Sequence, residues 1–390
     1  MSPSAAPMPR SPWIDDELAM LQDHVARFMA REFAPQAERW RRERQVDRSA
    51  WLKAAGAGLL CASIPEAYGG GGGTLAHEAV IHQELARAGL GGGFGAGNSV
   101  SSAIVAHYIL AYATEDQKQR WLPRMARGEL VGAIAMTEPD AGSDLQGVRT
   151  TAKPVDGGYR LNGQKTFISN GQTADLIVVV ARTGDEPGAK ALSLVVLEVE
   201  DAEGFRRGRK LEKLGMHAQD TSELFFDDVF VPAANLIGET PGRGFGQLMH
   251  QLAWERMIIA LDATVNMERA VQLTVDYVRE RKMFGKALIE FQNTEFVLAD
   301  AKTEATVART LVDALMVRLL AGELDPATAA MAKLWTTETQ CKVIDACQQL
   351  FGGNGYMADY PIAELYADAR VSRIYGGASE VMKLIIARTL

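Results

Sequence analysis

The sequence has few of the features that mark secreted, membrane or nucleic-acid-binding proteins. Its three cysteines are too few and too scattered for a disulfide framework or a zinc site, so we expect no metal and favour a reducing cytoplasm as the location. No stretch approaches the run of about 18 apolar residues that a membrane span needs. The net charge of −8 argues against a nucleic-acid partner, which would call for a basic face.

Residues 1–12 also lack the apolar block of a signal peptide. They hold four prolines and a single basic residue, Arg10, and we expect them to form a disordered leader. The whole chain of 390 residues has 47% apolar and 23% charged residues, which is typical of an ordinary globular protein with room for two or three domains.

The spacing of the apolar residues changes twice along the chain. Helical spacing predicts helices at 15–44, 51–57, 75–87, 99–113 and 115–127, separated by glycine-rich loops at 69–73 and 89–97. Short runs rich in Val, Leu, Ile and Phe predict strands at 176–181, 192–199 and 224–231. Helical spacing returns at 245–281, 291–321, 326–351, 362–370 and 379–388. We therefore expect an α+β, mostly α chain with a helical domain (1–132), a β domain (133–242) and a helical domain (243–390).

Two turns of the expected β domain carry polar groups that suit a planar ligand. The first is T-E-P-D-A-G-S-D at 137–144, and the second is N-G-Q-K-T-F-I-S-N-G at 162–171. Gly157-Gly158 and Asn162-Gly163 bracket a short run through Tyr159 and Leu161, which predicts a hairpin. Hydroxyl groups of Thr137, Ser143 and Ser169 would then line one side of the ligand. For either turn alone, an ordinary surface turn of a β domain is the favoured interpretation.

Two motifs of the last third suit a nucleotide. R-K-M-F-G-K at 281–286 joins basic residues to an aromatic ring and a glycine, a suitable grip for a pyrophosphate and an adenine. Q-L-F-G-G-N-G at 349–355 ends a helix on small residues that allow close backbone approach to a ligand. Each also reads as an ordinary helix C-terminus.

In this order, the four motifs resemble the acyl-CoA dehydrogenase family, and the resemblance covers nearly the whole chain beyond the leader. It implies an N-terminal helical domain, a middle β-barrel or sandwich domain and a C-terminal four-helix bundle. It also implies noncovalent FAD, an acyl-CoA substrate oxidised to a trans-2-enoyl-CoA, and electrons passed to an electron-transferring flavoprotein. A homotetramer, built as a dimer of dimers, is implied as well.

The resemblance carries over cofactor-binding and substrate-binding residues. In the β domain the cofactor residues are Ile134, Met136, Thr137, Gly142, Ser143, Phe167 and Ser169. In the last third they are Arg281, Phe284, Gln292, Gln349, Gly352, Gly353, Ala378 and Glu380, of which Arg281, Phe284, Gln349 and Gly353 would serve the flavin of a neighbouring subunit. The substrate residues are Ser143, Met249, Leu252, Arg256, Tyr375, Gly376 and Gly377. The chain departs from the family at Asp140, Phe167 and Ala378, where glycine, tryptophan and threonine are common.

The catalytic base does not carry over in the usual way. Most of the family place a glutamate after the tyrosine of I-Y-G-G-A-S-E at 374–380, where this chain has Gly376. The long-chain and isovaleryl types place the base on the long helix after the β domain, one residue before an arginine, and Glu255 matches that position. Its neighbours Trp254, Met257 and Ile258 predict burial and a raised pKa. A salt bridge of Glu255 at a helix–helix seam is the structural alternative.

Two further functions stay open at the level of the sequence. One is a flavin oxidase or monooxygenase on this scaffold, which would react with oxygen. The other is a non-catalytic flavoprotein that acts as an interaction module, which Gly376 alone would suggest.

Overall fold

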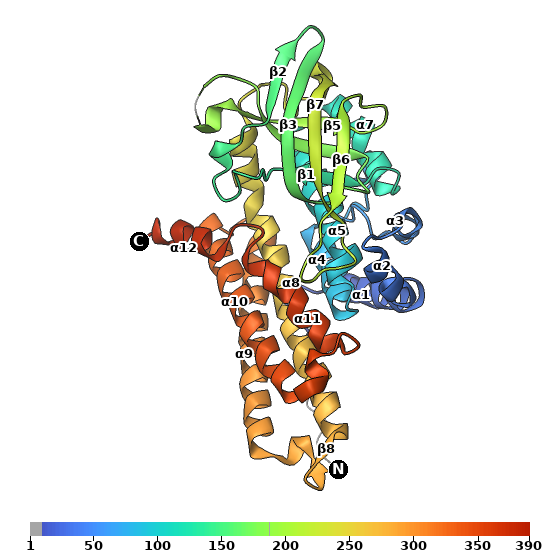
Figure 1. The fold of residues 1–390 in the computed structure, drawn as a ribbon, viewed down its shortest axis with the longest axis vertical. Helices are drawn as coiled ribbons and strands as arrows, with labels where there is room; N and C mark the ends of the chain where they lie inside the picture. The colour runs from blue at the N-terminus through green and yellow to red at the C-terminus, as the bar shows by residue number, and fades with distance from the viewer. Residues whose placement is uncertain (1–9, 187) are drawn as a thin grey trace.

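The computed structural model describes residues 10–186 and 188–390, in which a sheet sits at one end of the molecule and a bundle of long helices forms the other (Figure 1). A separate group of shorter helices packs beside both. The first nine residues of the predicted leader lie outside the described residues. Arg10, within the predicted leader, forms an ion pair with Asp16 (2.8 Å).

The first third is helical, as predicted. Its α-helices are α1 (Asp16–Phe28), α2 (Ala37–Glu43), α3 (Arg48–Gly56), α4 (Leu75–Arg87), α5 (Ala96–Asn98), α6 (Ala106–Tyr112) and α7 (Glu115–Ala126). At Pro35, where the sequence predicts a kink or an end, the chain passes through a π-helical turn and a 3-10 turn, Met29–Phe33 and Ala34–Gln36. Thr74 and Thr114 cap α4 and α7 by accepting hydrogen bonds from backbone N–H groups, which satisfies donors that a helix leaves free.

The predicted loop at 89–97 is wrong, because much of it is helical. Gly91–Gly95 forms a π-helical turn that is kinked at Gly93 (φ −129°, ψ −107°) and leads directly into α5. The glycines are needed for close packing rather than for freedom: a Cβ on Gly92 would overlap the Asp368 carboxylate, and one on Gly93 would lie 2.8 Å from Cβ of Ala218. Contacts with segments far along the chain, which the local sequence does not reveal, override the low helix propensity of glycine here.

The middle third is a curled sheet. Its strands are β1 (Gly132–Ala135), β2 (Thr151–Val155), β3 (Gly158–Ser169), β4 (Leu176–Arg182), β5 (Leu192–Glu198), β6 (Phe205–Lys210) and β7 (Thr221–Pro232). The order is β1-β4-β2-β3-β7-β6, and β5 pairs with β4. β4 and β5 are buried along nearly their whole length, as expected of continuous runs of Val, Leu and Ile. β6 is among the strands that the sequence does not predict, because F-R-R-G-R-K lacks apolar alternation. It pairs with β7, and the Arg206 guanidinium lies over the Phe225 ring.

The predicted hairpin forms, with one correction. β2 and β3 pair antiparallel across the turn at 156–157, where Gly157 has a φ of 74°. Asn162-Gly163 is not a turn. β3 continues through it, and the pairing with β7 shifts register between Leu161 and Gly163, which makes this glycine part of a β-bulge.

The last third consists of long helices, as predicted. They are α8 (Gly244–Glu280), α9 (Gln292–Leu320), α10 (Pro326–Leu350), α11 (Pro361–Ala369) and α12 (Ser379–Ala387). A short hairpin of β8 (Lys282–Met283) and β9 (Lys286–Ala287) joins α8 to α9 and lies at the end of the molecule opposite the sheet (Figure 1). In the described part of the chain, no helix combines the length and the apolar character that a membrane crossing requires.

Helix α8 ties the three regions together. Its start packs on β5, where the Gly242 N–H donates to the Ser193 hydroxyl (2.8 Å). Its middle packs against α4, α9 and α10 in one apolar cluster that contains Met257, Ile258 and Leu261. Groups on the middle of α8 therefore lie where sheet, short helices and bundle meet. The fold is the one expected from the sequence, while the boundaries at 132/133 and 242/243 stay predictions.

Candidate active site

Glu255 lies in the buried middle of α8. Its side chain is 7% exposed, and the Tyr108 hydroxyl donates a hydrogen bond to its Oε1 atom (2.9 Å). Burial raises the pKa of Glu255 to about 7, although the Tyr108 hydrogen bond and the nearby Arg256 charge both favour the carboxylate. A carboxylate of this kind can accept a weakly acidic proton near neutral pH.

Among the described residues, the structure does not contain the alternative, which was a structural salt bridge of Glu255. Glu255 forms no ion pair with any described residue. Arg256, its sequence neighbour, turns instead toward the start of α10, where Nη1 lies 3.5 Å from the Pro326 carbonyl oxygen. The guanidinium is buried and its Nε–H has no partner among the described residues. The indole N–H of Trp254 donates to the Ala103 carbonyl (3.0 Å), which fixes this turn of α8 against the short helices.

Tyr108 is the residue of this site that the sequence does not identify. It lies on α6, 147 residues before Glu255, and it is fully buried. Its position within a helical run of apolar residues indicates a core residue and carries no sign of its partner. Burial and the Glu255 charge raise the pKa of Tyr108, so the hydroxyl remains a hydrogen-bond donor at neutral pH.

The 374–377 loop lies beside the same face of α8. Gly376 has a φ of 63°, and a Cβ there would overlap Cδ1 of Ile259, which follows Glu255 by one helical turn. Lys333 of α10 donates to the Gly377 carbonyl (2.7 Å) and so holds the loop in place. Position 376, which has no side chain, thus lies against the turn of α8 that follows the Glu255 carboxylate.

The other predicted substrate residues fall into separate groups. Met249 and Leu252 are one turn apart on α8, with Met249 exposed and Leu252 half-buried. Tyr375 is partly exposed and lines a cavity beside α8. Ser143 belongs to the middle region. The structure places Gly376 against Ile259, one turn after Glu255, and it places Arg256 against α10.

The cofactor residues predicted in the β domain do come together. Ile134 lies on β1, with Met136 and Thr137 directly after it, and the Thr166 N–H donates to the Thr137 carbonyl (2.9 Å). The turn that follows Thr137 closes through a pair of backbone hydrogen bonds between Glu138 and Ala141.

A buried ion pair joins the segment after β1 to β3. Lys165 Nζ lies 2.9 Å from both the Glu138 carboxylate and the Met136 carbonyl. The same carboxylate accepts from the backbone N–H groups of Arg149 (2.7 Å) and Thr150 (2.9 Å). These contacts and the Lys165 charge hold the pKa of Glu138 below its ordinary value against the effect of burial. Glu138 and Lys165 therefore fix the turn that presents Thr137, Gly142 and Ser143.

The surface of this cluster fits a flat, polar ring system. Phe167 is 67% exposed, has a φ of 59° and lies where β3 shifts register against β7. The hydroxyls of Thr137, Ser143 and Ser169 form no hydrogen bond with any described residue. A Cβ on Gly142 would meet nothing within 4 Å. A flavin ring requires hydrogen-bonding groups, apolar contact and room. This surface offers free hydroxyl groups, an exposed aromatic face and open space over a glycine.

Six of the cofactor residues predicted in the last third lie at the end of the molecule opposite the sheet, far from that cluster. Arg281, Phe284 and Gln292 surround the β8–β9 hairpin, and Phe284 is 87% exposed. Gln349, Gly352 and Gly353 lie at the end of α10. The Tyr277 ring stacks on Phe351 at a centroid distance of 4.1 Å, which joins these two groups at one end of the molecule. Ala378 and Glu380 form a third group at the start of α12, where Ser379 donates to Glu338 (2.7 Å).

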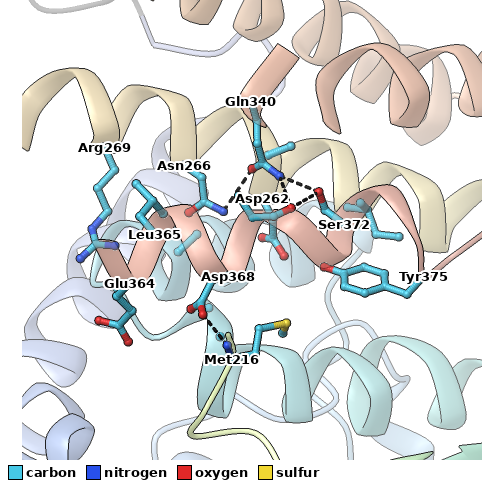
Figure 2. Close-up of a pocket in the computed structure, with 17 residues that line it drawn as sticks. Met216, Asp262, Asn266, Arg269, Gln340, Glu364, Leu365, Asp368, Ser372 and Tyr375 are labelled. Carbon is cyan, nitrogen blue, oxygen red and sulfur yellow. Dashed lines mark hydrogen bonds between the residues drawn. The ribbon is translucent and has the colours of Figure 1, made fainter. Parts of the chain in front are cut away.

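A cavity of about 50 Å³ opens where α8, α10, α11 and the turn at 89–92 meet (Figure 2). It begins at Ile259 and Tyr375, beside the 374–377 loop. The three cysteines are unpaired, and the residues described by the structure contain no cluster of His, Cys, Asp or Glu that could hold a metal ion.

Comparison with known proteins covers nearly the whole chain. Family models match in order: acyl-CoA dehydrogenase N-terminal domain at 15–129, middle domain at 133–229 and C-terminal domain at 242–390. The long-chain specific acyl-CoA dehydrogenase of Rattus norvegicus mitochondria is 45% identical over 95% of this chain and 86% of its own length. The mitochondrial isovaleryl-CoA dehydrogenase of Solanum tuberosum is 33% identical over 100% of this chain and 94% of its own.

Comparison with solved structures gives the same result as the comparison of sequences. An acyl-CoA dehydrogenase from Geobacillus kaustophilus superposes with a TM-score of 0.93 at 44% identity, covering 97% of this chain and 99% of that one. A glutaryl-CoA dehydrogenase from Mycobacterium smegmatis, in complex with FADH2, superposes with a TM-score of 0.89 at 26% identity over 96% and 95% of the two chains. From the three matched models and these relatives it follows that the chain belongs to the acyl-CoA dehydrogenase family.

Proposed function

We propose that Glu255 is the catalytic base of an FAD-dependent acyl-CoA dehydrogenase that converts an acyl-CoA to the trans-2-enoyl-CoA. The electrons then pass to an electron-transferring flavoprotein. The observation that carries the assignment of the base is the buried Glu255 carboxylate, which has a pKa of about 7, a Tyr108 hydrogen bond and a position beside side-chain-free Gly376. The matches to long-chain and isovaleryl-CoA dehydrogenases support it.

The chemistry divides between the protein and its cofactor. When bound, FAD supplies the acceptor for the hydride that leaves the β-carbon. Glu255 takes the α-proton, and the electron pair of that C–H bond forms the new double bond between C2 and C3. Tyr108 holds the carboxylate in one orientation and lowers its pKa relative to burial alone, which keeps part of the population ionised at neutral pH.

The hydroxyls of the middle region that have no partner among the described residues would hold the flavin ring. Thr137, Ser143 and Ser169 offer hydrogen bonds, while Phe167, Ile134 and Met136 offer apolar contact and Gly142 offers space. Ala378 and Glu380 at the start of α12 complete this set. Their support is the fit of unpaired donors and open surface described above, together with the family membership.

The remaining cofactor residues would serve a neighbouring subunit. α8 has 37 residues, so its ends are separated by about 55 Å at the usual rise per residue. That distance exceeds the length of an extended dinucleotide, so the residues at the β8–β9 hairpin cannot hold the flavin that contacts Thr137 in the same chain. Arg281, Phe284, Gln292, Gln349, Gly352 and Gly353 would instead bind the flavin of a partner. Exposed Phe284 and Tyr356 at this end favour a subunit interface, and we propose a homotetramer built as a dimer of dimers.

The thioester would lie along the face of α8 that carries Glu255. Met249 and Leu252 would contact the part of the substrate before the reacting carbons, with Ser143 across from them, and Tyr375, Gly376 and Gly377 would border the reacting carbons. Arg256 would act on Glu255 through its charge, because a positive charge favours the ionised form of this carboxyl group. A cytoplasmic location stays a prediction from the cysteine content.

Anaerobic titration with acyl-CoA thioesters tests this function. The protein should be yellow, and a thioester substrate should bleach the flavin without oxygen. Slow reoxidation in air, with rapid reoxidation by an electron-transferring flavoprotein, is the expected outcome. Fast reoxidation by air alone would identify an oxidase or monooxygenase. Retention of flavin with no bleaching by any thioester would contradict the proposal and indicate a non-catalytic flavoprotein.

A further inference from the structure

The cavity beside α8 continues the face that carries Glu255. Glu255, Ile259, Asp262 and Asn266 follow one another at intervals of four, three and four residues, so their side chains lie along one stripe of the helix. Ile259, Asp262 and Asn266 all line the cavity. An acyl chain whose α-carbon is at Glu255 and whose far end follows this stripe past Ile259 therefore enters the cavity.

The wall of the cavity is part apolar and part polar. Ile259, Ala263 and Ala86 are among its apolar residues. Asp262 and Asn266 follow on α8, and Figure 2 shows Asp262, Asn266 and Gln340 grouped around the same space. A pocket for a plain hydrocarbon chain would be lined by carbon throughout, since burying polar groups against a methyl terminus costs free energy.

Most polar groups of this wall already have partners in the protein. Gln340 donates to the Ser372 hydroxyl (2.7 Å) and receives a long hydrogen bond from Asn266 (3.5 Å). Asp368 accepts from the Met216 backbone N–H. Glu364 is held by both of its oxygens to Arg41 (2.8 Å), and the positive charge of Arg269 lies near Glu364 and Asp368.

Asp262 is different. Among the described residues its carboxyl group has no hydrogen-bond partner and no ion pair. It is partly accessible, and it lines the cavity, so the free oxygens can be reached from that space. Polar groups on the walls of cavities usually have partners, so a carboxyl group that lacks one within the protein is a candidate for contact with a ligand.

We propose that the substrate is an acyl-CoA whose chain carries a hydroxyl group in its distal part, and that Asp262 is the residue that receives this hydroxyl. The inference rests on the proposed dehydrogenase function. Asp262 follows Glu255 by seven residues, or about 10 Å along the helix, which corresponds to a hydroxyl about eight carbons beyond the α-carbon. Asp262 forms a hydrogen bond with the hydroxyl group, and the amide oxygen of Asn266 offers an acceptor beside it.

A neutral hydroxyl fits better than an ammonium group. Burial raises the pKa of Asp262 to about 8, so the carboxyl group is largely protonated at neutral pH. An ammonium group would require the ionised form, whereas a hydroxyl can donate to the carboxylate or accept from the acid. The protonated form therefore favours an uncharged partner.

The test compares dodecanoyl-CoA with derivatives hydroxylated near the tenth carbon and near the sixth carbon. With the FAD-bound enzyme, kcat/KM should be higher by at least about tenfold for the distal hydroxyl than for the plain chain, because a site built to bind a hydroxyl discriminates against its absence. The hydroxyl near the sixth carbon should give no such gain. Asp262→Asn should keep the preference through its amide oxygen, and Asp262→Leu should reverse it.

Asp276→Leu is the matched control. Asp276 lies on the same helix and is exposed, and among the described residues its side chain bonds only to Gln272 (2.9 Å), so this variant should keep the wild-type preference. Equal or better turnover of the plain chain by the wild type, unchanged in Asp262→Leu, would overturn the inference while leaving dehydrogenation intact. Absence of flavin bleaching by every thioester would instead contradict the proposed function. If Asp262→Leu loses its flavin, the substrate preferences of the wild type and of Asp262→Asn decide whether the inference holds.

Discussion

At the scale of single residues, Glu255 and Tyr108 show what fixes the chemistry of this site. Burial disfavours the carboxylate, and the Tyr108 hydrogen bond partly compensates, so that the pKa of Glu255 lies near 7. A base with a lower pKa would be too weak for a thioester α-proton, and one with a much higher pKa would be protonated and inactive at neutral pH. The balance depends on one hydrogen bond from another region of the chain.

This balance predicts a pH profile. Glu255 is active only when ionised, so kcat/KM should fall about tenfold for each pH unit below about 7 and level off above it. Tyr108→Phe removes a donor that favours the carboxylate, so the pKa of Glu255 should rise by about one unit and the profile should shift to higher pH.

Tyr112→Phe is the control for that shift. Tyr112 lies one turn later on α6, and its hydroxyl bonds to His250 (2.8 Å) rather than to Glu255. Its variant should keep the wild-type profile. A Tyr108→Phe profile that coincides with that of the wild type would remove Tyr108 from the site.

At the scale of structural elements, the turn at 137–144 depends on a buried ion pair. Lys165 on β3 and Glu138 in the turn are both buried, at 1% and 6% exposure. Lys165→Met should destabilise the fold by roughly 3–5 kcal/mol, because it leaves the Glu138 carboxylate without its buried cation. The turn should loosen, so flavin retention should fall with the melting temperature.

The exposed ion pair between Asp140 of this turn and Arg149, which follows it, is the comparison (3.1 Å). Asp140→Asn should change the melting temperature little, since exposed ion pairs contribute at most about 1 kcal/mol. Equal effects of the two variants on thermal unfolding would show that the turn does not depend on its buried pair.

The sequence predicted most elements, but not those that depend on distant contacts. The helical and strand spacings located α8 and β4 well, and Trp254, Met257 and Ile258 correctly indicated that Glu255 is buried. The glycines at 89–97 suggested a loop, yet the segment is largely helical because Asp368 and Ala218 pack against it. Asp262 reads as an ordinary polar position on α8, and its enclosure depends on α10 and α11, which no local pattern encodes.

At the scale of the whole molecule, the two groups of predicted cofactor residues lie too far apart for one flavin within one chain. A shared flavin predicts that FAD binding and subunit association depend on each other. The mass in solution should be that of a homotetramer with one FAD per subunit. A monomeric mass with full flavin occupancy would contradict the shared site.

Arg281→Ala tests the shared flavin site at a single residue. Loss of a charge-assisted contact of roughly 1.5–3 kcal/mol should weaken FAD binding about 10-fold to 100-fold without changing the middle-region turn. Arg279→Ala is a suitable control, since Arg279 is also exposed on the last turn of α8 and belongs to no predicted site. Equal flavin affinity in both variants would exclude Arg281 from the site.

The central claim is that Glu255 removes the α-proton, and stopped-flow bleaching of the flavin in Glu255→Gln tests it most directly. The glutamine keeps the shape of the side chain and can still accept from Tyr108, so FAD and thioester binding should persist. The rate of flavin reduction by an acyl-CoA should fall by a factor on the order of 10² to 10⁴, the usual contribution of a general base. Reduction at the wild-type rate, with the thioester bound, would contradict the account and require a different base.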